Sequence, residues 1–163
     1  MKHSEEHYKL YFGKKADHYL DVVKDLDSGK NVVFNFFSFF FGLFWMLYRK
    51  LYIPILIIAI LFFVEVIIEQ LILTAMNASI VTETFVDRKS MIVWATLFGQ
   101  FGIRMNIGQA NKKISKIIAL NLSEQETNKK IKIAGGTTFI PHLIILVLIV
   151  ILIILGQQGY FEF

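Results

Sequence analysis

Residues 51–76 have the sequence LYIPILIIAILFFVEVIIEQLILTAM, an apolar stretch in which only Glu65 and Glu69 carry charge. A helix of this length, at ~1.5 Å per residue, is long enough to cross a hydrocarbon core of ~30 Å. A second stretch, residues 135–156, contains the apolar run LIILVLIVILIIL. A water-soluble domain of 163 residues could not bury both segments. The sequence therefore predicts an all-α integral membrane protein surrounded by the lipid bilayer.

The composition supports this prediction and excludes several kinds of chemistry. Hydrophobic residues make up 55% of the chain and aromatic residues 15%, above ordinary globular usage. Cysteine is absent, which excludes disulfides, thiolate metal sites and cysteine nucleophiles. The sequence contains no serine-nucleophile elbow, zinc-binding helix motif or dinucleotide glycine fingerprint. We therefore predict no catalytic residue, no metal site and no cofactor, and we do not expect an enzyme.

A third transmembrane helix is predicted at residues 89–107, where the apolar run is weaker. Gly99, Gln100 and Gly102 lie within it, so we expect neighbouring helices to shield it from lipid. The spacing Ala95-x-x-x-Gly99 allows another helix backbone to approach closely. We expect the three spans, residues 51–76, 89–107 and 135–156, to pack as a small bundle.

A short aromatic segment, residues 33–48, precedes the first span and holds seven phenylalanines. Aromatic side chains favour the headgroup boundary of a bilayer. The segment is also short for a complete crossing, since the fifteen residues 34–48 reach only ~22 Å as a helix. We predict an interfacial or re-entrant helix here, with a complete crossing as the alternative.

The polar segments are predicted to lie in the cytoplasm. Residues 1–31 form an amphipathic N-terminal region, in which Ser4 caps the first helix and Gly13 divides the region into two helices. The membrane domain then covers residues 32–163 and includes a basic cytoplasmic loop at residues 108–134, with a short amphipathic helix in it. The first apolar run begins only at Val32, so we expect no cleavable signal peptide.

The distribution of Lys and Arg predicts the topology. Six of these residues precede the aromatic segment, two follow it directly, and seven lie within residues 104–132. With three crossings all fifteen face the cytoplasm, and only Arg88 and Lys89 lie outside, as the positive-inside rule favours. A fourth crossing by the aromatic segment would move residues 104–132 outside. We therefore predict a multi-pass protein with a cytoplasmic N-terminus and three crossings.

Three blocks of the sequence carry a resemblance to a known family. They are YFGKKADHYL at residues 11–20, the stretch from FNFF at 34–37 to FWMLYRKLY at 44–52, and GGTT at 135–138. Together they resemble the domain-of-unknown-function family 2628 of uncharacterised small bacterial inner-membrane proteins. The resemblance implies a bacterial inner (cytoplasmic) membrane protein with a few helices, and it brings no established activity or active-site residue.

Glu65 and Glu69 are the sharpest functional signal, because positions i and i+4 lie on one face of a helix. Carboxylates within a membrane are costly, and they commonly mark an ion or proton path. The structural alternative is that Glu69 forms an ion pair with Arg88 or Lys89, at the start of the next span. Catalysis by the two carboxylates is a third interpretation.

Gln100 and His142 are candidates for a second polar contact within the membrane. They lie at similar depth in their predicted helices, where they can hydrogen-bond across the bundle. A titrating histidine beside Gln100 would also suit a proton relay.

A possible lipid-phosphate contact precedes the last span. It combines ammonium groups with backbone N–H groups that can bind an anion. The residues are Lys129, Lys130, Lys132, Gly135, Gly136 and Thr137. A flexible helix entry with a threonine cap is the alternative.

From these observations we expect a non-enzymatic scaffold or accessory component of the cell envelope. One alternative is a transport or channel component that moves protons or cations through Glu65 and Glu69; another is a protein that binds or modifies lipid headgroups. Three helices shield two carboxylates poorly, so we expect a homo-oligomer or a larger membrane-protein partner. The positive charge flanks apolar segments, which is typical of contact with anionic lipid, and we expect no binding of nucleic acid.

Overall fold

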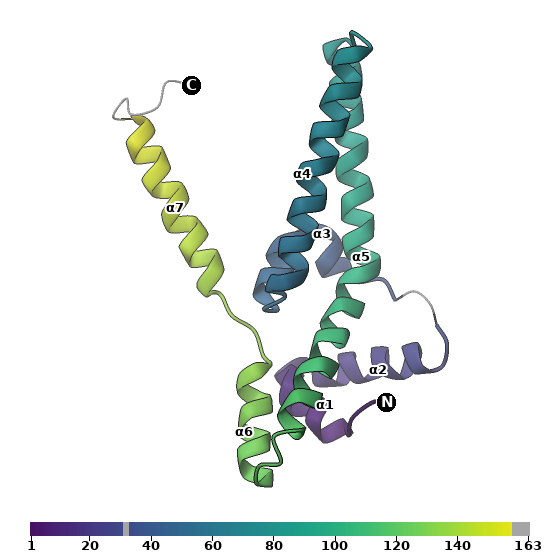
Figure 1. Ribbon diagram of the computed structural model, residues 1–163, viewed down its shortest axis with the longest axis vertical. Coiled ribbons are helices and arrows are strands. Elements are labelled where there is room, and N and C mark those ends of the chain that lie inside the picture. Colours follow the sequence, from purple (N-terminus) through teal and green to yellow (C-terminus); the bar gives the residue numbers. More distant parts are fainter. Residues whose placement is uncertain (31–32, 158–163) are drawn as a thin grey trace.

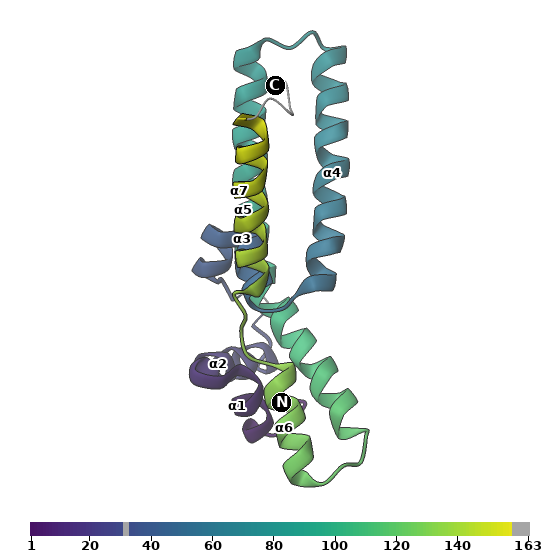
Figure 2. The same cartoon turned by 90° about the vertical axis from the view of Figure 1, so that its left-hand side faces the viewer.

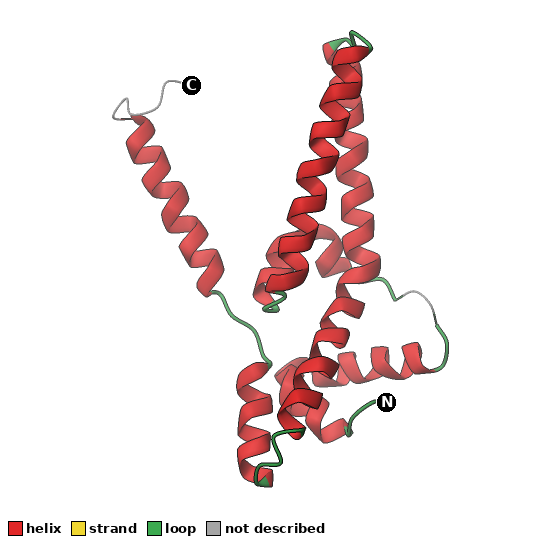
Figure 3. Cartoon of the chain, in the orientation of Figure 1, coloured by secondary structure: helices red, strands yellow, loops and turns green. Residues whose placement is uncertain are grey.

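The computed structural model describes residues 1–30 and 33–157, and within them the chain contains helices and no strand (Figures 1 and 3). The predicted all-helical class is confirmed. The elements are α1 (Glu5–Phe12), the 3-10 turn η1 (Gly13–Lys15), α2 (Ala16–Asp27), α3 (Phe36–Tyr48), α4 (Tyr52–Ala75), α5 (Ile80–Ile118), α6 (Glu124–Ala134) and α7 (Ile140–Gln157). The predicted boundary between residues 31 and 32, and the end of the membrane domain at residues 158–163, lie outside the described residues.

The N-terminal helices form as predicted. Ser4 caps α1, since its Oγ accepts a hydrogen bond from the His7 N–H at 3.3 Å. Gly13 adopts a positive φ of 65° and separates α1 from α2. The apolar faces of both helices share one hydrophobic core with α6 and the C-terminal half of α5, and we call this unit the module. Its core consists of Tyr8, Tyr11, Phe12, Ala16, Tyr19, Leu20, Val22, Val23, Ile103, Ile107, Ala110, Ile114 and Ile131.

Helix α5 is one helix of 39 residues that belongs to both the module and the rest of the molecule. The sequence predicts a span that ends at residue 107 and a loop over residues 108–134 with a short amphipathic helix in it; instead α5 continues to Ile118, and α6 follows after a short turn. The reason is an apolar face that does not stop at residue 107. Ile103, Ile107 and Ile114 keep helical spacing and are buried by the module.

Helix α3 packs across α5 and is bent at Gly42, where φ is 44° and ψ is −119° (Figure 1). The chain at and just before α3 approaches α5 closely because Gly99 and Gly102 of α5 have no side chain. A Cβ atom on Gly99 would lie 2.5 Å from the Phe34 ring, and one on Gly102 would overlap the Ser38 hydroxyl. The predicted close approach at Gly99 is confirmed, and α3 is the helix that uses it.

Helices α4 and α5 form a hairpin that extends away from the module, and α7 diverges from this hairpin (Figures 1 and 2). Among the described residues two helices, α4 and α7, are long and apolar enough to cross a membrane, whereas α5 does not meet that criterion. The predicted three-helix bundle is wrong for the described residues, since α7 packs chiefly on α3. The physical reason is that the first turn of α7 is fixed to α3, while α4 and α7 expose apolar side chains along their length.

Candidate functional site

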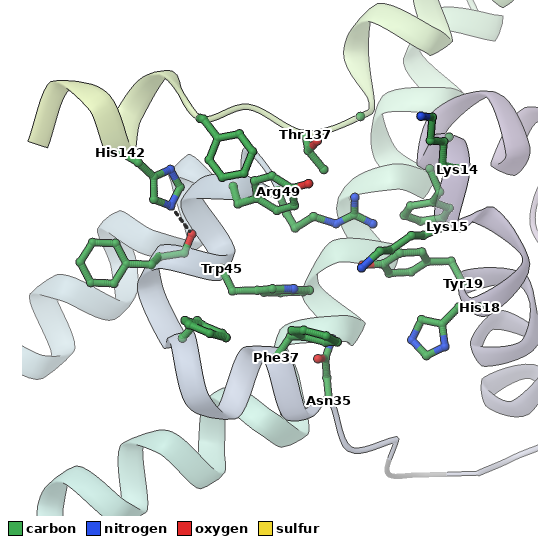
Figure 4. A pocket seen from close by; sticks show the side chains of 17 residues that line it. Lys14, Lys15, His18, Tyr19, Asn35, Phe37, Trp45, Arg49, Thr137 and His142 are labelled. Atoms are coloured by element: carbon green, nitrogen blue, oxygen red, sulfur yellow. Dashed lines mark hydrogen bonds between the residues drawn. The ribbon is translucent and has the colours of Figure 1, made fainter. Parts of the chain in front are cut away.

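A cavity of about 870 Å³ lies where the module, α3 and the start of α7 meet (Figure 4). Residues on both sides of the bend at Gly42 line it, so the bend gives α3 one continuous wall. The lining consists of Phe12, Gly13, Lys14, Lys15, His18, Tyr19, Asn35, Phe37, Phe41, Phe44, Trp45, Tyr48, Arg49, Gly136, Thr137, Phe139 and His142. We call it the joint cavity.

Arg49 is the buried cation of the joint cavity. The residue is 5% exposed, and its guanidinium points into the cavity (Figure 4). The guanidinium carbon lies 4.4 Å from the centroid of the Tyr19 ring and 5.7 Å from that of Phe12. These cation–π contacts stabilise the charge but do not satisfy its N–H donors. Among the described residues, Nε and Nη2 have no hydrogen-bond partner, which is costly for a buried cation.

The surroundings of Arg49 are also positively charged. Lys14, Lys15 and His18 line the module side of the cavity, and the Lys15 Nζ lies 5.0 Å from the centroid of the Phe37 ring. Of the described residues that line the cavity, none is Asp or Glu. Burial raises the pKa of Tyr19 against the lowering effect of the Arg49 charge, so the phenol adds no negative charge at neutral pH. The electrostatics of the cavity therefore favour an anion.

The opposite wall of the cavity is aromatic. Phe37, Phe41 and Phe44 project from α3 and are 60%, 58% and 54% exposed. Phe139, just before α7, lies against Tyr48 with ring centroids 4.8 Å apart. The joint cavity thus has a cationic side on the module and an apolar side on α3 and α7.

His142 connects α7 to α3. Its Nε2 donates to the Phe44 carbonyl at 3.0 Å. The predicted contact with Gln100 is therefore wrong, because α7 diverges from the helix that carries Gln100 (Figure 1).

The Gly135–Thr138 segment is fixed by hydrogen bonds within the chain. The Gly136 N–H donates to the Tyr11 carbonyl at 2.8 Å, and the Gly135 N–H donates to the Ile131 carbonyl at 3.0 Å. Thr138 caps α7, since its Oγ1 accepts from the Ile140 N–H at 3.2 Å. The structure thus corrects the predicted lipid contact through these two glycine N–H groups, because neighbouring carbonyls already occupy both.

The lysines that surround this segment differ from those predicted. Lys129, Lys130 and Lys132 are exposed on α6 and do not line the joint cavity. Instead, the Lys50 Nζ donates to the Gly135 carbonyl at 2.6 Å and the Lys113 Nζ to the Ala134 carbonyl at 3.3 Å. These two cations satisfy carbonyls at the C-terminus of α6, where the helix dipole favours positive charge. Gly136 and Thr137 do line the cavity.

Glu65 and Glu69 lie together in the hairpin, as their spacing predicts, and both contact Ser90. The Ser90 Oγ is 2.8 Å from an oxygen of each carboxyl group. The Trp94 indole also donates to Glu65, at 3.4 Å.

The predicted ion pair of Glu69 with Arg88 or Lys89 is wrong, since no such pair forms among the described residues. Ser90 and Trp94, at positions i and i+4, present one face of α5 to α4. The Lys89 Nζ lies instead over the Phe85 ring, 5.1 Å from its centroid.

Sequence reasoning did not select Arg49, Lys14, Lys15 or Tyr19 as site residues. In the sequence the three cations indicate topology, and Tyr19 belongs to the apolar face of an amphipathic helix. A usable signal was present, because the blocks at residues 11–20, 34–52 and 135–138 supply most of the cavity lining.

No protein-family model, curated protein or solved structure matches the chain.

Proposed function

We propose that this chain is a non-enzymatic accessory protein of the bacterial inner membrane that binds an anion in the joint cavity. The observation that carries the proposal is the Arg49 guanidinium, which is buried with two unpaired nitrogens in a cavity whose described lining holds no carboxylate. An unpaired buried charge costs several kcal/mol. A carboxylate or phosphate with two acceptor oxygens matches the guanidinium fork and offsets that cost.

The proposed topology has three crossings, by α4, by the part of α5 within residues 89–107, and by α7, with the N-terminus in the cytoplasm. Helices α1 and α2 share one hydrophobic core with α6 and the C-terminal half of α5, so these segments lie on the same side of any membrane. A complete crossing by α3 would separate them, which argues against the four-crossing alternative. In this arrangement the joint cavity lies at the cytoplasmic boundary of the bilayer.

The topology can be tested with single cysteines, because the chain has none of its own. Lys130→Cys lies on the exposed face of α6, and Met76→Cys is 71% exposed at the turn between α4 and α5. A membrane-impermeant maleimide should label Met76→Cys in intact spheroplasts and Lys130→Cys only after lysis. The opposite labelling pattern would disprove the proposed orientation.

Anion binding can be followed through Trp45, which lines the cavity and is 8% exposed. In a Trp94→Phe background, purified protein in neutral detergent is titrated with inorganic pyrophosphate and with a phosphatidic acid. We expect at least one of them to change the Trp45 fluorescence and to raise the melting temperature, since a ligand that binds only the folded state stabilises it.

Arg49→Gln is expected to weaken that binding at least tenfold, whereas Arg49→Lys should retain part of it. Arg104→Gln is the matched control, because Arg104 lies on α5 and does not line the cavity. If Arg49→Gln misfolds, the double variant Lys14→Gln/Lys15→Gln changes only exposed side chains at the same site and should weaken binding several-fold. The absence of a response to both ligands would disprove the proposed function.

A second candidate function, movement of protons or cations, is favoured by the shared contact of Glu65 and Glu69 with Ser90. Two carboxyl groups held by one hydroxyl form a polar site within the proposed span, and association of protomers would shield it from lipid. Proteoliposomes should then show a proton or cation flux that Glu65→Gln abolishes. Equal flux with and without that substitution would eliminate this candidate.

A further inference from the structure

We infer that the anion bound at Arg49 is the phosphate of an anionic glycerophospholipid, with its chain lying along the aromatic wall of α3. The inference rests on the proposed function, since it names the class of ligand that the joint cavity takes. The cavity has a cationic side and an apolar side, and it lies between the module and the apolar helices.

The cavity separates charge from apolar surface, as a lipid does. On the module side, Arg49 is buried and unpaired, and Lys14 and Lys15 are exposed around it (Figure 4). On the opposite side, Phe41 and Phe44 present half-exposed rings. A phosphate at the first side and an acyl chain at the second satisfy both at once. A soluble anion would leave the aromatic wall uncovered.

The volume also exceeds what a bare phosphate fills. A water molecule takes up ~30 Å³ in the liquid, and an inorganic phosphate is only a few times larger. The cavity measures about 870 Å³, which falls in the range of ~300–1,000 Å³ typical of sites for larger organic ligands. A phosphate with its glycerol group and the first part of a chain fits this space.

The apolar side of the cavity continues directly into α7. Phe139 lines the cavity and is 69% exposed, and Ile140, the first residue of α7, is 68% exposed. Aromatic side chains in such positions favour the headgroup boundary of a bilayer. A lipid can therefore enter sideways from the cytoplasmic leaflet, with its phosphate reaching Arg49 and its chain remaining beside α3 and α7.

The test compares lipid-borne and soluble phosphate on the same protein. The Trp45 fluorescence of the Trp94→Phe protein in neutral detergent is titrated with dioleoyl phosphatidic acid, dioleoyl phosphatidylglycerol, dioleoyl phosphatidylcholine, glycerol 3-phosphate and inorganic phosphate. We expect at least one anionic lipid to bind tenfold or more tightly than either soluble phosphate and than phosphatidylcholine. Arg49→Gln should abolish this preference for the anionic lipid over phosphatidylcholine.

The chain side of the cavity is tested by Phe44→Ala, with Phe40→Ala as the matched control. Both residues belong to α3 and are exposed, but only Phe44 lines the cavity. Phe44→Ala should weaken lipid binding several-fold and leave the binding of soluble phosphate unchanged, and Phe40→Ala should change neither.

Three results would overturn the lipid inference in distinguishable ways. Equal affinity for glycerol 3-phosphate and the lipids would leave anion binding intact and identify a soluble ligand. Equal affinity for phosphatidylcholine and the anionic lipids would show that charge does not select the ligand. No binding of any phosphate compound would remove the proposed function together with the inference.

Discussion

Arg49 is the residue on which the proposed anion site depends, because its guanidinium is buried and two of its nitrogens are unpaired among the described residues. In the structure it is buried against Tyr19 and Phe12, two residues of the module. Its burial depends on how α2 packs against the end of α3, and no local pattern in the sequence reports that contact.

The glycines of α5 allow a prediction at the same scale. A methyl group at Gly102 would overlap the Ser38 hydroxyl and lie 3.3 Å from the Trp45 ring, whereas nothing lies within 4 Å of one at Gly108. Gly102→Ala should lower the free energy of unfolding by about 1–3 kcal/mol through overpacking. Gly108→Ala, the control in the same helix, should leave it unchanged or raise it by up to ~1 kcal/mol.

Chemical denaturation of both glycine variants in detergent measures the difference. Equal stability of the two would show that α3 does not pack against α5 as the structure has it.

At the scale of the element, α5 exceeds what the pattern of the sequence predicts. The apolar run weakens after residue 103, and polar residues such as Arg104 and Asn106 suggested the end of a span. Asn106 is 1% exposed within the helix, and the isoleucines that follow face the module core. A hydropathy window averages the hydropathy of all faces of a helix. It therefore detects that fewer residues are apolar, but it does not detect that one face of the helix stays apolar and buried.

The C-terminus of α6 gives a second prediction. Burial and the nearby charge of Lys50 lower the pKa of Lys113, whose Nζ donates to the Ala134 carbonyl. Lys113→Met should free that carbonyl, lower the free energy of unfolding by about 0.5–1.5 kcal/mol and speed amide exchange in residues 131–136.

Lys112→Met is the control for this change, since Lys112 is next to Lys113 in the chain and its side chain is exposed. It should change the free energy of unfolding by less than about 0.5 kcal/mol. Hydrogen exchange followed by mass spectrometry resolves the two variants. Unchanged exchange in Lys113→Met would show that this lysine does not hold the end of α6.

At the scale of the whole molecule, the module core imposes a pH dependence. Burial raises the pKa of Tyr11 and of Tyr19 above the ordinary value of 10.0. The stabilisation by these neutral phenols is fully present below pH ~10, and it is lost as the pH rises through the raised folded values, because the unfolded chain releases its protons first.

The melting temperature should therefore fall as the pH rises above ~10, together with the rise of tyrosinate absorbance at 295 nm. Tyr19→Phe should show a smaller fall over the same range. An equal fall in both proteins would mean that Tyr19 does not contribute to alkaline unfolding.

The sequence was sufficient for the helical class, for the cap at Ser4, for the break at Gly13 and for the apolar helices α4 and α7. Each of these depends on residues close together in the chain. The joint cavity depends on three segments that are far apart in the sequence, so its residues could not be assembled from local spacing. The divergence of α7 is equally non-local, since it follows from contacts such as that of His142 with Phe44.

The continuity of α5 has a consequence for the geometry of the binding site. The helix contacts α3 at Gly99 and Gly102, and the module at Ile107 and Ile114. One continuous helix therefore fixes how the two sides of the proposed site are rotated relative to each other. Each residue added to an α-helix rotates the residues that follow it by ~100° about the helix axis. One residue inserted after Ile103 would therefore rotate Tyr19 and Lys15 away from Arg49, and affinity would be lost without loss of helix.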